Sequence, residues 1–126
     1  MKLLLLITAV LEAATGLAFF VMSAVAVSML LGVELDTPAG LVAGAALVAL
    51  AIACWQARNG ESGSPAMSVI AAMLFYNFAV GLILVYAGVR IGLYSALLWP
   101  AIVVHQLLGV WCLIVLWVAA RTIQQR

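Results

Sequence analysis

Glu12, Asn77 and His105 each lie in the middle of a different apolar run, in a chain of 126 residues of which 69% are hydrophobic. Placing such a group in hydrocarbon costs on the order of 2.5 to 3.5 kcal/mol, so it persists where it is paired or used. At a rise of about 1.5 Å per residue, all three groups fall near the middle of a bilayer. The sequence therefore predicts one intramembrane polar cluster built from three helices.

Two kinds of chemistry fit this cluster. Its members can hydrogen-bond one another and hold helices together, with Glu12 neutral because burial disfavours its charged form. They can instead bind a proton, a cation or a ligand, since an intramembrane carboxyl group is a functional candidate by default. Thr15 shares one polar stripe of the first helix with Glu12 and joins the predicted ligand or proton site. Both interpretations stay open at this point.

The composition is that of a membrane protein. The mean hydropathy is +1.35, and 7% of the residues are charged, against roughly 25% in soluble domains. Four apolar stretches, about 3–31, 39–57, 66–89 and 96–120, reach the length needed to cross a membrane. The first begins like a signal peptide, but it stays apolar as far as Leu31, which favours a membrane helix. We expect an all-α fold, an integral membrane antiparallel four-helix bundle, with 1–126 as a single transmembrane domain.

The breaks between the stretches contain residues typical of helix starts. Asp36-Thr37-Pro38 and Ser64-Pro65 each place a proline directly after candidate capping residues. Each connection is under about ten residues long, so successive helices must be antiparallel neighbours.

The charges divide unevenly between the two ends of this arrangement. One end has four basic residues, and the other has one basic and two acidic residues: Lys2, Arg58, Arg121 and Arg126 at the first, Arg90, Glu34 and Asp36 at the second. The positive-inside rule then predicts a multi-pass protein of the inner (plasma) membrane with both termini in the cytoplasm.

Four glycines are candidates for helix packing. Gly40 and Gly44 have the GxxxG spacing in the second stretch, and Gly81 and Gly109 lie on the faces that carry the polar residues of the third and fourth. Small residues allow helix backbones to approach closely in membranes. We expect these positions to pack against helices of the same chain rather than to mediate dimerisation.

Several chemistries lack their residues. One His and no CxxC leave too few ligands for a structural metal, so we predict no metal site. No Gly-rich phosphate loop, GxSxG or HExxH pattern is present, and the sequence leaves the cofactor unknown. A net charge of +1 excludes nucleic acid as a partner.

The run Gly44-Ala-Ala-Leu-Val-Ala-Leu-Ala-Ile-Ala-Cys-Trp-Gln-Ala-Arg58, with the four-helix topology, resembles the small DoxX-like membrane proteins of bacteria. That resemblance implies an accessory role, because some members are implied to be small subunits of quinone-linked membrane oxidoreductases. The Arg usual early in their first helix is absent here. Leu11-Glu12-Ala-Ala-Thr15-Gly16 is similar to the first helix of small multidrug resistance transporters, whose single membrane-embedded Glu exchanges protons and cations; Glu12 is the matching residue.

We therefore expect a non-catalytic accessory subunit of a membrane complex, or a homo-oligomer, in which the polar cluster binds a small apolar ligand or partner helices. One alternative is a proton-coupled small-molecule transporter that uses Glu12. A second is a quinone-binding component of a membrane oxidoreductase, in which the His105 imidazole hydrogen-bonds a quinone carbonyl.

Overall fold

The computed structural model describes residues 1–33, 37–60 and 65–125. Within them the elements are helical: α1 (Lys2–Val21), α2 (Ser23–Leu31), α3 (Thr37–Ala57), α4 (Pro65–Tyr86), a π-helical turn η1 (Ala87–Ile91) and α5 (Leu98–Gln124). Four of these helices, α1, α3, α4 and α5, are long and apolar enough to cross a membrane. The predicted all-α bundle of membrane helices is confirmed.

The helix starts follow the proline pattern of the sequence. Pro38 lies in the first turn of α3 and Pro65 is the first residue of α4, where the missing N–H breaks no intrahelical hydrogen bond. The predicted capping residues Asp36 and Ser64 lie outside the described residues, as do Glu34 and Arg126 of the predicted charge distribution.

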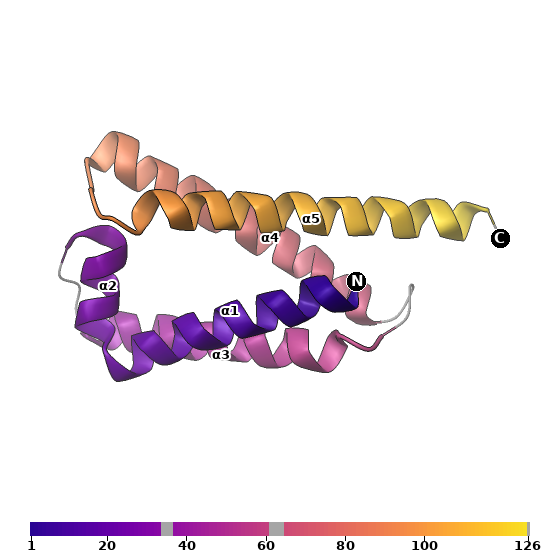
Figure 1. Cartoon of the computed structure of the whole chain (residues 1–126), viewed down its shortest axis with the longest axis horizontal. Coiled ribbons are helices and arrows are strands. Elements are labelled where there is room, and N and C mark those ends of the chain that lie inside the picture. The colour runs from indigo at the N-terminus through magenta and orange to yellow at the C-terminus, as the bar shows by residue number, and fades with distance from the viewer. Residues whose placement is uncertain (34–36, 61–64, 126) are drawn as a thin grey trace.

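The first apolar stretch, expected as one helix, is divided at Met22. Its backbone angles of φ −138° and ψ 50° leave the helical region, and α2 begins at the next residue. A continuous helix over 3–31 would be about 43 Å long, which exceeds a hydrocarbon core of about 30 Å. The break lets α1 cross the membrane while α2 turns away from its axis (Figure 1).

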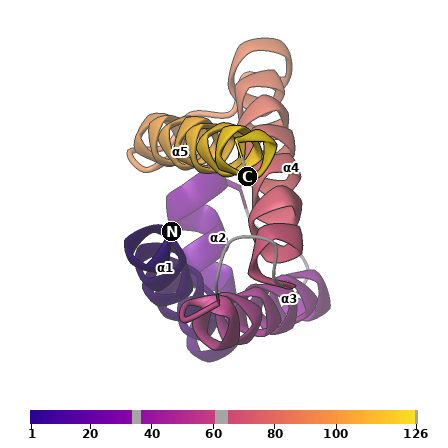
Figure 2. The ribbon, with the colours of Figure 1, turned by 90° about the vertical axis from the view of Figure 1, so that its right-hand side faces the viewer.

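The long helices form two antiparallel pairs. α1 lies along α3, and α4 lies along α5 (Figure 1). α4 begins near the end of α3 and runs obliquely to the far end of the bundle. The end view places the four helices around a common centre, with α2 behind them at the far end (Figure 2). Both termini lie at the same end of the bundle. This arrangement brings side chains of α1, α4 and α5 to the centre.

The pairing of α1 with α3 depends on two glycines that meet face to face. A methyl group on Gly16 would lie 2.8 Å from Val48 Cγ2 and 2.9 Å from the Gly44 carbonyl oxygen, and one on Gly44 would lie 2.9 Å from the Gly16 carbonyl oxygen. Two helix backbones this close leave no room for a side chain at either position. The GxxxG glycine Gly44 therefore packs within the chain.

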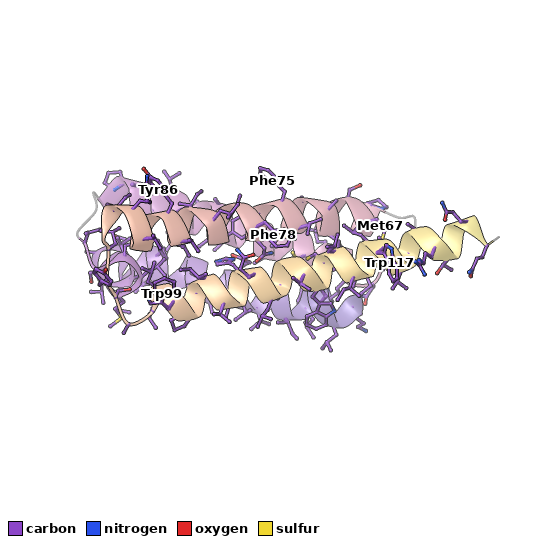
Figure 3. The ribbon with its side chains drawn as sticks, turned by 90° about the horizontal axis from the view of Figure 1, so that it is seen from above. Met67, Phe75, Phe78, Tyr86, Trp99 and Trp117 are labelled. Atoms are coloured by element: carbon purple, nitrogen blue, oxygen red, sulfur yellow. The ribbon has the colours of Figure 1, made fainter. Side chains whose placement is uncertain are left out.

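The pairing of α4 with α5 uses an aromatic ring in place of a second glycine. The ring of Phe78 covers Gly109, whose added methyl group would lie 3.2 Å from it, and Figure 3 shows Phe78 between the two helices and Phe75 pointing away from them. Gly81, on α4, faces the side chain of Gln106 on α5. Gly40, near the start of α3, lies against Ser23 of α2.

Trp99 lies at the start of α5, and Trp117 lies about two turns before its end (Figure 3). They are separated by about 27 Å along the helix axis, close to the thickness of a hydrocarbon core. Both rings are about half exposed, as expected of tryptophans that lie at the two membrane interfaces. The spacing supports a membrane crossing by α5.

Candidate functional site

The polar side chains expected at mid-membrane lie together at the centre of the bundle. Tyr76 of α4 donates a hydrogen bond from its hydroxyl group to Glu12 Oε2 of α1, over 3.4 Å. Its ring meets the His105 ring of α5 edge to face, with 5.7 Å between centroids. His105 Nδ1 lies 3.0 Å from Asn77 Oδ1. The cluster of Glu12, Tyr76, Asn77 and His105 therefore joins three helices.

The amide of Asn77 fixes the direction of its hydrogen bonds. Its Nδ2 donates to the Met73 carbonyl oxygen over 2.8 Å, so Oδ1 is the atom that faces His105. An amide oxygen only accepts, and His105 Nδ1 must therefore carry the proton of this pair. In a neutral imidazole, Nε2 is then left with a lone pair and no proton.

The side chains of the cluster differ in how deeply they are buried in the bundle. Asn77 is fully buried and Glu12 is 4% exposed, whereas Tyr76 and His105 are half-buried. Glu12 lies about 15 Å along α1 from Lys2, and Asn77 about 18 Å along α4 from Pro65, at about 1.5 Å per residue. Both therefore lie near the middle of a membrane crossed by these helices.

Thr15, the fourth residue of the predicted site, is exposed on α1 less than one turn from Glu12. Thr15 lies three residues beyond Glu12 and so is offset from it by about 60° around the helix axis. Glu12 is on the buried side of α1, facing Tyr76, and Thr15 lies at the exposed edge of the same face. The structure thus brings together three of the four predicted residues.

Tyr76 is the member of the cluster that sequence reasoning missed. Asn77 and Tyr76 are consecutive and so point about 100° apart around α4. Asn77 reaches α5, and Tyr76 reaches α1. The sequence did offer a signal, because the Tyr76 hydroxyl group directly precedes the Asn77 amide in the same apolar run. An interpretation that considers only the helix face of Asn77 omits Tyr76.

The buried polar atoms of the cluster all have hydrogen-bond partners. Among the described residues, no buried side-chain nitrogen or oxygen lacks a partner. A carboxyl group, a phenol and an imidazole are all groups that exchange protons, and their contacts run from α1 through α4 to α5. Within the same described part of the chain, no three His, Cys, Asp or Glu side chains gather where they could hold a metal ion.

Comparison of the chain with models of known families, with curated proteins and with solved structures finds no match.

Proposed function

We propose that this integral membrane protein is a non-catalytic accessory subunit that associates with other membrane helices, and that its polar cluster holds its own two helix pairs together. The observation that carries the proposal is the internal pairing of the cluster. Glu12 and Tyr76 connect the α1–α3 pair to the α4–α5 pair, and Asn77 and His105 pair with each other. Such contacts stabilise helix association in membranes by about 0.6 kcal/mol each on average, and by up to about 1.7 kcal/mol.

The outer face of α3 supports association with partner helices. Ala45 and Ala49 are exposed one turn apart, with Val42 on the same face. Helix interfaces in membranes are enriched in small residues because they permit close backbone approach. We assign this face to contacts with a partner subunit or with a second copy of the chain.

The proposal includes the orientation of the protein in the membrane and its relationship to a protein family. Lys2, Arg58 and Arg121 lie at the end of the bundle that holds the termini, and Arg90 lies at the opposite end. This distribution supports cytoplasmic termini in the inner (plasma) membrane. The pattern of residues 44–58 supports a relationship to DoxX-like proteins.

The experiment is native mass spectrometry of the protein extracted gently from its own membrane. We expect wild type to appear with partner subunits or as a homo-oligomer. Ala45→Leu and Ala49→Leu each add bulk at the proposed interface and should lower the assembled fraction about tenfold, the equivalent of an overpacking cost of 1 to 2 kcal/mol. Ala72→Leu, on the exposed face of α4, is the control and should assemble normally. Recovery of wild type solely as a monomer would contradict the proposal.

A second candidate function is proton-coupled transport through Glu12. It is favoured by the continuous contacts among three proton-exchanging groups, Glu12, Tyr76 and His105. In that mechanism Glu12 must lose and regain a proton, whereas an accessory role leaves it permanently neutral. The two functions therefore differ in one measurable property of Glu12.

The quinone-binding alternative has less support. A quinone carbonyl oxygen requires a hydrogen-bond donor, but the only proton of a neutral His105 is engaged with Asn77 through Nδ1. The remaining Nε2 atom offers a lone pair to a ligand. No contact in the cluster favours this alternative over the other two.

A further inference from the structure

A shallow apolar groove of about 340 Å³ runs along the outer side of the α1–α3 pair. Small and branched aliphatic side chains form its walls, and two larger side chains lie at one end. These are Ala9, Val10, Ala13, Val48, Ala51 and Ile52 along the walls, with Trp55 and Gln56 at the end. The groove is distinct from the polar cluster, whose members do not line it.

The groove has the length of one membrane leaflet. On α3 it runs from Val48 to Gln56, and α3 ends at Ala57. Val48 is therefore about 13 Å from the helix end, at about 1.5 Å per residue. Half of a hydrocarbon core is about 15 Å. A groove that starts at the interface and ends near the midplane matches a single acyl chain rather than a transmembrane helix, which would continue into the other leaflet.

The interfacial end of the groove carries positive charge. Trp55 lines the groove, and the guanidinium carbon of Arg58 lies 3.7 Å from the centroid of its ring. Arg58 also donates a hydrogen bond to the Trp55 carbonyl oxygen, which holds it beside the groove. Lys2 begins the adjacent helix α1 at the same end of the bundle. Two cations beside the mouth of an apolar groove complement a lipid whose headgroup is anionic.

We propose that this groove binds one anionic phospholipid, with an acyl chain between α1 and α3 and the phosphate at Arg58. The proposal does not rest on the accessory role, because neither a member of the polar cluster nor Ala45 or Ala49 lines the groove. Trp55 connects its two parts: one side of the ring borders the acyl chain, and its face orients the guanidinium group.

The test is a titration of delipidated protein in detergent with dioleoyl phosphatidylglycerol or dioleoyl phosphatidylcholine, followed by native mass spectrometry. Wild type should bind one phosphatidylglycerol more tightly than phosphatidylcholine. Arg58→Gln should lower the affinity for phosphatidylglycerol about fivefold, as expected for the loss of one interfacial cation. The affinity for phosphatidylcholine should fall less, because its choline ammonium group offsets the charge of its phosphate. Ala13→Leu fills the groove and should lower the affinity for both lipids about tenfold. This is the loss expected when about two methylene groups of the acyl chain are displaced from the groove.

The chain supplies a matched control for each variant. Arg121 stacks on Trp117 at 3.6 Å, in the same manner as Arg58 on Trp55 but away from the groove, so Arg121→Gln should bind both lipids as wild type does. Ala14 is exposed on α1 beside Ala13 and does not line the groove, so Ala14→Leu should also bind normally. Equal effects of Arg58→Gln and Arg121→Gln would overturn the proposal. Wild-type binding by Ala13→Leu would overturn it as well.

Discussion

Replacing Gly44 with leucine is expected to force α1 away from α3 and to cause a large loss of stability. Even the first added carbon would lie 2.9 Å from the Gly16 carbonyl oxygen and 3.1 Å from Phe19 Cβ. One of these is a backbone atom of a helix, so relief requires movement of the whole helix. Overpacking of this kind typically costs 1 to 3 kcal/mol, and more where the backbone must shift.

The measurement is the midpoint of thermal unfolding in detergent, together with the yield of monodisperse protein. Gly44→Leu should unfold at a clearly lower temperature than wild type or fail to accumulate. Ala46→Leu is the control, because Ala46 lies two residues away on the same helix and is exposed. If both variants have the same unfolding midpoint as wild type, α1 and α3 do not pack through their glycines.

Asn77→Leu is expected to lower the free energy of unfolding by about 2 kcal/mol. The substitution removes the hydrogen bond between Asn77 and His105, and it also leaves the proton on His105 Nδ1 without an acceptor. Asparagine and leucine are similar in size, so the loss arises from polarity and not from a cavity. His105→Leu should be destabilising for the reciprocal reason, since it leaves the fully buried Oδ1 of Asn77 unpaired.

The pair can be tested by a double-mutant comparison. Asn77→Leu combined with His105→Leu removes both polar groups, leaves neither unpaired, and should be more stable than either single variant. Phe75→Leu is the control, because this side chain is 77% exposed and should change the unfolding midpoint little. A double variant that loses the sum of the two single losses would show that Asn77 and His105 do not interact.

Hydropathy was sufficient to predict the four membrane helices, because each crossing must bury about 20 apolar residues in lipid. It did not predict the break at Met22, because residues 17–31 around it contain no Pro or Gly. The π-helical turn over Ala87–Ile91 was not predicted either. Hydropathy reports the length and composition of an apolar run, and it contains no signal for a local break or a change of helix type within that run.

The grouping of Glu12, Asn77 and His105 was accessible from depth alone, since three polar groups at one level of a small bundle have few other partners. The rotation of each helix about its own axis, which decides which side chains face the centre, was harder to predict from the sequence. Thr15 was assigned to the site from its stripe on α1 but is exposed, whereas Tyr76 was left out and provides the contact with Glu12. An apolar helix has no strongly polar face to define its orientation, so the positions of single side chains depend on packing that the sequence does not display.

We propose that Glu12 is a fixed hydrogen-bond partner of Tyr76 and not a proton carrier. The infrared difference spectrum between acidic and alkaline buffer, recorded in lipid for wild type and Glu12→Gln, tests this proposal. The variant keeps the volume and a hydrogen-bonding group, so it should fold, and the band that it lacks identifies the Glu12 carboxyl group. We predict that this band is unchanged between the two buffers, because burial at this depth disfavours the charged form of the carboxyl group. A band that disappears from wild type in alkaline buffer, together with cation uptake that is driven by a pH gradient and abolished by Glu12→Gln, would contradict the claim and establish the transporter.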